Sequence, residues 1–316
     1  GRGDRRTTAW RATLYLGLAS MVLLAALLMI GTQAGFTFSG LKDFMASGRE
    51  LAHAELIGAQ LIAGFGTLIS LFPFHSWAAP AYASAPAPVA MMHAGVLKKF
   101  GLYGLFMFQP LMETGFLPWT NILLVLLVCN VIWVGYVTVN QKRLDLLLGN
   151  SSVMHMGYIF LAFAALVVSG SAEANPWALK GAALLMLAHG LTIALLFLLC
   201  GQIEKQTGTL EINSLGGLST RLPRMAFVFG LAGMASIGLP GLANFPGEFM
   251  VFFSGFAGFS NGFGPVQIAT ILCLWGLVIG AVYMLRAYRN IFQGDLSKAS
   301  AYATGLQPSE PVSYTH

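Results

Sequence analysis

Long apolar runs separated by short polar segments dominate the chain. A helix that crosses a membrane needs about 20 apolar residues, and the sequence supplies such runs repeatedly. We therefore predict an all-α polytopic membrane protein with about eight transmembrane helices. The predicted spans are residues 10–31, 54–74, 88–109, 120–140, 150–170, 177–200, 224–256 and 266–292.

The seventh run is long enough for one long crossing or for two short ones. Its middle reads Gly238-Leu-Pro-Gly241 and then Phe245-Pro-Gly-Glu248. Proline and glycine in such a cluster interrupt a helix rather than continue it. We predict one crossing made by a broken helix, because two crossings would weaken the separation of basic residues described next.

Basic residues are unevenly divided between the two sides that eight crossings define. An excess of lysine and arginine marks the cytoplasmic side, so we expect both termini of this segment in the cytoplasm. Since the chain opens with Gly1 and a polar stretch, we also expect it to be part of a longer protein. The basic side carries Arg2, Arg5, Arg6, Arg11, Lys142, Arg143, Lys205, Arg221, Arg224, Arg286, Arg289 and Lys298, and the other side carries Lys42, Arg49 and Lys180.

Composition supports the membrane assignment and excludes several classes of protein. Of the 316 residues, 56% are hydrophobic and 9% are charged, whereas a soluble domain carries about 25% charged residues. A soluble enzyme, a nucleic-acid-binding module and a disordered protein are therefore disfavoured. Cys129, Cys200 and Cys273 lie in apolar runs without paired spacing, so neither a disulfide framework nor a zinc site is expected.

Five ionisable residues lie well inside the predicted spans, and a sixth lies just past the break in the seventh. Such a residue at the centre of a bilayer costs roughly 2.5–3.5 kcal/mol, so each is a candidate functional residue. No nucleophile–base pair, phosphate loop or metal-ligand spacing accompanies them, and we expect no catalytic site, metal or cofactor on this chain. The six are His93, Lys98, Lys99, His155, His189 and Glu248.

Each of these residues also has a structural interpretation. Lys98 can extend towards the membrane surface or hydrogen-bond a neighbouring helix, and it points about 100° away from Lys99 on a helix. His93 can be a packing histidine, and His155 can lie at the membrane interface. His189 in mid-span and Glu248 beside the break are harder to explain in this way.

The functional interpretation is a path for protons. Histidine gains and loses a proton near neutral pH, and lysine and glutamate can do so in a buried site. These residue types on successive helices are the chemical set that proton transfer through a membrane requires.

Seven motifs give the chain a resemblance to a known family. They are FPFHSW at 72–77, APAP at 85–88, HAGVLKKFGLYG at 93–104, SSVMHMG at 151–157, LAHG at 187–190, INSLGG at 212–217 and GLPGLANFPGEF at 238–249. From about residue 9 to 294, the sequence resembles the antiporter-like, proton-translocating membrane subunits of respiratory complex I, the NADH–quinone oxidoreductase. The last motif is most similar to the branch called chain M, because the sister chains L and N carry a lysine where this branch has the glutamate.

The resemblance implies a fold of fourteen helices with two inverted five-helix repeats, also met in other transporters. This chain would comprise helices six to thirteen, with broken helices near Pro73 and Pro240. Residues 1–110 would be the remainder of the first antiporter-like half, 111–294 the second half, and 295–316 a polar cytoplasmic tail.

The resemblance also assigns roles to the candidate residues. Lys99 would link two half-channels, His155 and His189 would carry protons along the second, and Glu248 would be its terminal group. Lys98 and His93 are secondary candidates.

The chain departs from the family pattern at two places. Leu68 stands where the family has a lysine seven residues before the histidine of the FPFHSW motif, with Ser70 where proline is common. The usual acidic-x-basic-basic run reads Lys142-Arg-Leu-Asp145. A leucine cannot carry a proton, so the first half-channel cannot operate as it does in the family.

The implied function is proton translocation in the membrane arm of complex I, in a bacterial-type inner membrane. Partners would be the other membrane subunits, the lipid bilayer and protons, with no nucleic acid. NAD, FMN, iron–sulfur clusters and quinone would be bound by partner subunits. Two alternatives remain open: a subunit of a multisubunit cation/proton antiporter or membrane-bound hydrogenase, and a structural spacer that has lost transport.

Overall fold

Helices form the regular structure of the computed structural model, which describes residues 5–257, 262–301 and 303. Within these residues the only β pairing is an isolated bridge between Arg143 and Glu211. The prediction of an all-α protein is therefore confirmed. Arg2, and residues 302 and 304–316 of the predicted tail, lie outside the described part.

Five of the eight predicted spans are helices long and apolar enough to cross a membrane. They are α1 (Arg5–Ala34), α9 (Leu144–Ser169), α10 (Pro176–Thr207), α13 (Pro265–Phe292), and the continuous segment in which α7 (Glu113–Phe116) and η3 (Leu117–Trp119) lead into α8 (Thr120–Val139).

The other three predicted spans are interrupted, which leaves each helical piece shorter than a full crossing. The pieces are α3 (Ala54–Ile69) with α4 (Ala78–Ser84), α5 (Ala87–Met92) with η1 (His93–Leu97) and α6 (Lys99–Phe108), and α11 (Pro223–Ile237) with α12 (Asn244–Gly255). Short connecting elements complete the chain: α2 (Phe38–Ala46), η2 (Gln109–Leu111), η4 (Ile212–Ser214), η5 (Leu218–Thr220) and α14 (Lys298–Ala301).

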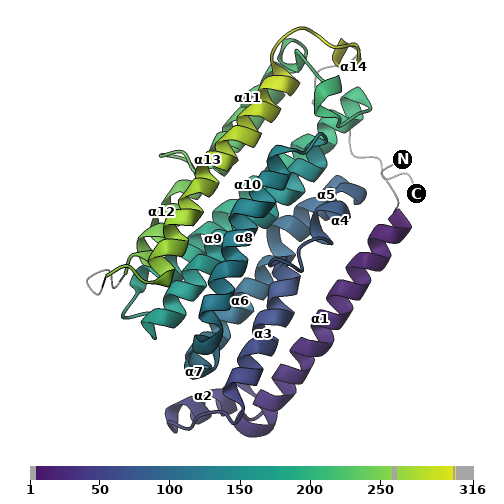
Figure 1. The fold of residues 1–316 in the computed structure, drawn as a ribbon. Helices are drawn as coiled ribbons and strands as arrows, with labels where there is room; N and C mark the ends of the chain where they lie inside the picture. Colours follow the sequence, from purple (N-terminus) through teal and green to yellow (C-terminus); the bar gives the residue numbers. More distant parts are fainter. Residues whose placement is uncertain (1–4, 258–261, 302, 304–316) are drawn as a thin grey trace.

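The helices are arranged around α9 (Figure 1). From Ser151 to Val167 every residue of α9 is buried, and the helix contacts α4, α8, α10, α12 and α13. On one side α11, α12 and α13 pack together, and on the other side α1 packs on α3. The residues that α9 carries are therefore the most deeply enclosed in the molecule.

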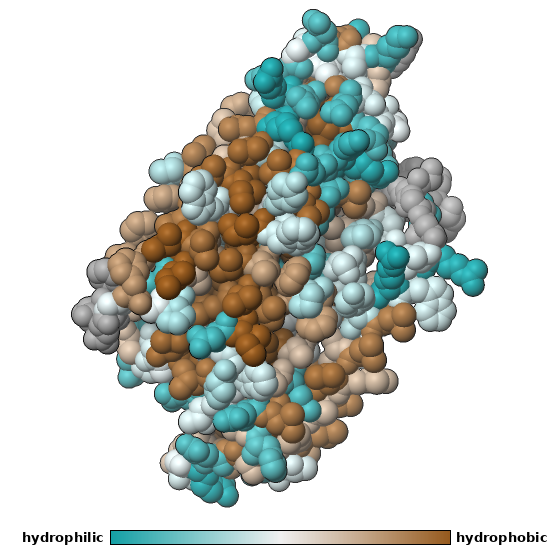
Figure 2. Space-filling view, viewed as in Figure 1, coloured by the Kyte–Doolittle hydropathy of each residue, from teal (hydrophilic) through white to brown (hydrophobic). Residues whose placement is uncertain are grey.

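The outer surface has the hydrophobicity expected in a lipid bilayer. Figure 2 shows an apolar belt across the middle of the face, with most hydrophilic residues gathered towards the two ends. Met21 on α1 is 71% exposed and Trp275 on α13 is 60% exposed. Large apolar side chains exposed in this number are a liability in water and normal against lipid.

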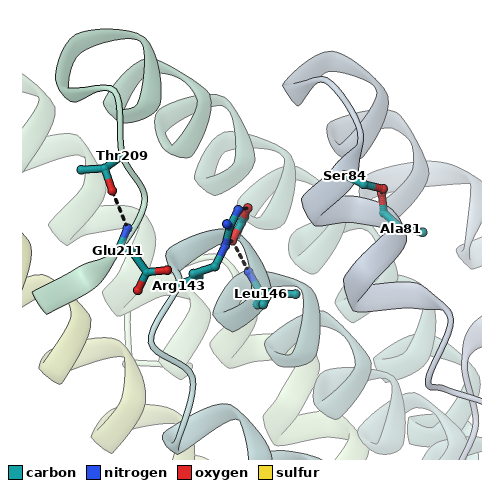
Figure 3. Close-up of polar contacts among 7 residues, drawn as sticks. Ala81, Ser84, Arg143, Leu146, Thr209 and Glu211 are labelled. Carbon is teal, nitrogen blue, oxygen red and sulfur yellow. Dashed lines mark hydrogen bonds and ion pairs between the residues drawn. The ribbon is translucent and has the colours of Figure 1, made fainter. Parts of the chain in front are cut away.

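The predicted start of the fifth span at residue 150 is wrong, because α9 begins at Leu144. Asp145 lies in its first turn and accepts a hydrogen bond from the Leu146 backbone N–H at 2.8 Å, and the Arg143 guanidinium donates to it at 2.6 Å (Figure 3). The Asp145 carboxylate raises the pKa of Arg143. A carboxylate in the first turn favours a helix start, so the helix extends into a segment whose charges conceal it in a hydropathy profile.

The first break separates α3 from α4 near Pro73, where the resemblance implies one. Ser70 has a left-handed backbone conformation (φ 72°), and the peptide before Pro73 is cis. Asn130 of α8 satisfies the freed backbone groups: its Oδ1 accepts from the Phe72 N–H at 2.6 Å and its Nδ2 donates to the Ser70 carbonyl at 3.2 Å. The same Nδ2 donates to the carbonyl of Val153 on α9 at 3.2 Å.

The second break is the one that the glycine and proline cluster predicts. Helix α11 ends at Ile237, Gly238 adopts a left-handed conformation (φ 79°), and α12 resumes at Asn244. This prediction is confirmed. Helices α11 and α12 follow one another along the bundle (Figure 1), and residues 239–241 of the break between them are exposed, whereas Asn244 at the start of α12 is buried.

Candidate functional site

A π-helical turn sets the direction of the two neighbouring lysines. In η1 the Lys98 N–H donates to the His93 carbonyl, five residues back, at 3.1 Å. The Lys99 ammonium donates to the carbonyl oxygen of Ala94 within the same turn. Single π turns inside α-helices occur frequently at functional sites, because they change the direction of the side chains that follow.

Lys99 points towards α10. Gly95 and Gly190 form a close helix crossing, since a Cβ built on Gly190 would lie 2.7 Å from the Gly95 carbonyl oxygen. The same Cβ would lie 4.0 Å from Cε of Lys99. The lysine chain therefore passes beside α10 next to His189.

His155 and His189 form a stacked pair at the centre of the bundle. Their ring centroids are 5.0 Å apart with an interplanar angle of 21°, and the two side chains are 2% and 1% exposed. Nε2 of His189 lies 3.3 Å from the Ser152 hydroxyl, and its Nδ1 has no hydrogen-bond partner among the described residues. The early start of α9 places His155 well inside the helix, away from both of its ends.

Both ring nitrogens of His155 face backbone carbonyl oxygens. Nδ1 lies 2.8 Å from the oxygen of Ser151, and Nε2 lies 2.9 Å from the oxygen of Ser236 on α11. A carbonyl oxygen only accepts, and a neutral imidazole has a single N–H, whereas an imidazolium donates from both nitrogens. The protonated ring can therefore donate a hydrogen bond to each carbonyl, whereas the neutral ring can donate to only one of them.

Glu248 lies on α12 beside the second break. It is 3% exposed, its Oε2 lies against Gly238, and its Oε1 has no hydrogen-bond partner among the described residues. It lines a cavity of about 320 Å³ whose other walls are Gly238, Phe245, Phe249, Phe252, Phe253, Phe256, Leu274 and Leu277. The last turn of α11 thus contacts His155 through Ser236 and Glu248 through Gly238.

Four of the six candidate residues therefore lie in one buried row. Lys99 borders α10 beside His189, His189 stacks on His155, and the end of α11 joins His155 to Glu248. The other two candidates, Lys98 and His93, share a different neighbour. Both border Tyr82 of α4: the Lys98 ammonium is 5.8 Å from the centre of the Tyr82 ring, and the His93 ring is 5.4 Å from it.

Comparison with known proteins gives this geometry a context. Residues 2–278 match the family model described as NADH:quinone oxidoreductase/Mrp antiporter, transmembrane. The chain belongs to this family. It is a multi-pass membrane protein of the antiporter-like type, as the motifs imply.

Relatives and solved structures agree with that assignment. The chain is 34% identical over 319 residues to NAD(P)H-quinone oxidoreductase chain 4 2 of Microcystis aeruginosa, which covers 98% of this chain and 55% of the relative. It is 35% identical over 302 residues to chain 4 1 of Synechococcus elongatus, covering 93% and 54%. The chain thus spans about half the length of the curated relatives it matches.

Two structures share the fold. A chain of respiratory complex I from Thermus thermophilus with bound NADH matches with a TM-score of 0.83 and 26% identity, over 97% of this chain and 62% of that one. A chain of the Mrp complex from Dietzia sp. DQ12-45-1b matches with a TM-score of 0.76 and 20% identity, over 92% and 52%.

Three residues of this antiporter-family site were not candidates from the sequence. Asn130 interrupts the middle of the apolar run 120–140, and an amide at that depth is a signal that could have been used. Tyr82 stands out only once the structure shows that Lys98 and His93 lie beside it. Ser236 acts through its backbone carbonyl, which every residue possesses, so no sequence signal identifies it.

Proposed function

We propose that this chain is a proton-translocating membrane subunit of a complex I type NADH–quinone oxidoreductase. The observation that carries the proposal is the buried row of Lys99, His155, His189 and Glu248, each no more than 7% exposed. Four titratable groups within an apolar interior are costly to keep unless they function. The complex I family members among the relatives and structures support the partner assembly.

We infer eight crossings, of which the α3–α4, α5–α6 and α11–α12 crossings are interrupted helices. Residues 1–110 then belong to a first antiporter-like half, residues 111–294 form the second, and residues 295–316 are a polar cytoplasmic tail. The membrane is the inner membrane of a bacterial-type cell, with both ends of this segment in the cytoplasm, because the basic residues gather there.

In the proposed mechanism this chain holds no redox centre. NAD, FMN, iron–sulfur clusters and quinone are bound by partner subunits, whose electron transfer changes the charge on the row. Lys99 receives a proton and releases it to the histidine pair. His155 holds it as an imidazolium between the carbonyls of Ser151 and Ser236, and the Glu248 carboxylate accepts it before release to the outer side.

The stacked arrangement of the histidines sets a condition on this path. The two rings meet face to face, so no direct hydrogen bond joins their nitrogens. A bridging water molecule can carry the proton between them at little cost in energy. The unpartnered Nδ1 of His189 is the nitrogen available for such a bridge.

A cation/proton antiporter subunit is the second candidate, since the family model covers Mrp antiporters and the Mrp structure shares the fold. The identities of 34% and 35% to NAD(P)H-quinone oxidoreductase subunits favour complex I over it. A structural spacer is disfavoured because it would gain nothing from buried, unpaired Glu248.

The test is proton pumping by the whole complex, carrying Glu248→Gln or Lys99→Met in the full-length subunit and reconstituted into vesicles. We expect both variants to lower the number of protons translocated per NADH while NADH oxidation by an artificial acceptor persists. Glu173→Gln and Lys180→Met, which alter exposed residues, serve as matched controls. Normal pumping in both row variants would contradict the proposal, and absence of NADH oxidation from a complex that contains this chain would favour an antiporter assembly.

A further inference from the structure

Lys98 carries a buried amino group without a hydrogen-bond partner among the described residues. The side chain is 0% exposed, and Nζ makes no hydrogen bond to any described residue. It does not reach the membrane surface, and it does not hydrogen-bond a neighbouring helix, so neither structural interpretation applies. Its Nζ lies 5.8 Å from the centre of the Tyr82 ring.

The residues around Lys98 form a second polar cluster beside the buried row, near enough for the charge of Lys98 to act on His155 and His189. We call Trp77, Tyr82, His93 and Lys98 the first-break cluster. The His93 ring lies 5.5 Å from Trp77 and 5.4 Å from Tyr82. The Tyr82 hydroxyl and Nδ1 of His93 are also buried without a partner among the described residues. Three unpartnered polar groups in one place are unusual in a folded protein and call for a functional explanation.

The geometry places this cluster at the first broken helix. Lys98 precedes Gly101 by one turn and so shares its face of the helix. A Cβ on Gly101 would lie 2.6 Å from Cγ1 of Ile69, the last residue of α3. Trp77, at the other end of the break, donates from Nε1 to the carbonyl of Thr67 at 3.1 Å. The lysine therefore carries a positive charge to the break from the neighbouring helix.

Leu68 lies in the last turn of the same α3, at the position where the family resemblance implies a lysine. Lys98 supplies to this region the lysine amino group that is absent at Leu68. Lys98 and Lys99 are consecutive and so point about 100° apart, Lys98 towards Tyr82 of α4 and Lys99 towards α10.

We propose that Lys98 is a second proton-carrying residue, which serves the first broken helix as Lys99 serves the second half of the chain. This inference rests on the proposed function. A proton passes from a water molecule to the lone pair of the neutral Lys98 amine and is later returned to water, and the unpartnered hydroxyl of Tyr82, whose ring lies 5.8 Å from Nζ, is a group through which that water is held. Since like charges on neighbouring residues disfavour each other, protonation of Lys98 favours release of the Lys99 proton to the histidines.

The test compares Lys98→Met and Lys98→Arg in the assembled complex, reconstituted into vesicles. Methionine keeps an unbranched side chain and removes the titratable group, whereas arginine keeps the charge and cannot release a proton. We expect both to lower the protons translocated per NADH to the same extent as Lys99→Met, with NADH oxidation by an artificial acceptor retained. The double variant Lys98→Met/Lys99→Met should be no lower than either single one, because the two residues act on one path.

The outcomes separate this inference from the proposed function. Full pumping by Lys98→Arg would mean that Lys98 is a fixed charge and would overturn the inference. Full pumping by Lys98→Met, together with a fall in Lys99→Met and Glu248→Gln, would overturn it and leave the proposed function intact. If Lys98→Met does not assemble, Tyr82→Phe retains the ring and removes the hydroxyl: a lowered ratio supports the inference, and an unchanged ratio overturns it.

Discussion

Nε2 of His155 lies 2.9 Å from the backbone carbonyl oxygen of Ser236, and this contact joins the central helix α9 to the last turn of α11. Two residues after Ser236, the second broken helix is interrupted at Gly238. The Glu248 carboxylate of α12 lies against this glycine. A change in the charge of His155 therefore changes its hydrogen bond to the end of α11, next to the break.

Replacing His155 by glutamine should impair pumping more than stability. A glutamine amide can donate to one of the two carbonyls but cannot take up a proton to serve both. We expect a lower ratio of protons to NADH, with a stability loss of about 0.5–1.5 kcal/mol for one hydrogen bond. Pumping by the reconstituted complex and its thermal unfolding measure the two effects. His53→Gln, at an exposed histidine, is the control, and an unchanged ratio in His155→Gln would exclude this ring from the path.

Gly238 and Gly241 form a matched pair for testing the position of Glu248. Both have positive φ angles, 79° and 88°, so alanine at either site costs about 1–2 kcal/mol of backbone strain. A Cβ on Gly238 would collide with the Glu248 carboxylate, whereas a Cβ on Gly241 meets nothing within 4 Å. We expect Gly238→Ala to lower pumping and Gly241→Ala to leave it intact, measured in vesicles. Equal effects would show that backbone strain, and not contact with Glu248, is responsible.

Asn130 should be needed for folding around the first break. It is 0% exposed and bonds the Phe72 N–H and the carbonyls of Ser70 and Val153. Leucine has a similar shape and leaves those groups unsatisfied, each at a cost of about 1–3 kcal/mol.

We therefore expect Asn130→Leu to lower the unfolding temperature of the purified complex and the amount of assembled subunit. Asn121→Leu changes an exposed residue of the same helix and should affect neither. Similar unfolding temperatures for the two variants would mean that the amide of Asn130 does not stabilise the break.

The helices that cross at Gly95 and Gly190 are packed too closely to accept a Cβ atom at Gly190. In Gly190→Ala the new Cβ would lie 2.7 Å from the Gly95 carbonyl oxygen, so the helices must separate beside Lys99, at a cost of about 1–3 kcal/mol. Gly17→Ala is the control, because nothing lies within 4 Å of its Cβ and alanine favours a helix. Thermal unfolding of the complex should show a loss for Gly190→Ala and no loss for Gly17→Ala. A loss of the same size in both would mean that the crossing is not tightly packed.

The sequence by itself determined features that depend on local composition. Apolar length predicted the long helices, because the bilayer requires it. The cluster around Pro240 predicted the second break, because proline removes a backbone donor and glycine permits left-handed conformations. The cost of a charge in lipid selected the candidate residues before any neighbour was known. The first break, near Pro73, followed only from the family resemblance.

Only the tertiary structure decided which of these residues meet. The carbonyl of Ser236 beside His155 and the reach of Asn130 to the first break depend on helices far apart in the chain. Backbone carbonyls are the same at every residue, so sequence cannot say which of them will face a histidine. Local preferences shape each helix, whereas the packing of one helix on another sets which groups share a buried space and therefore which can exchange a proton.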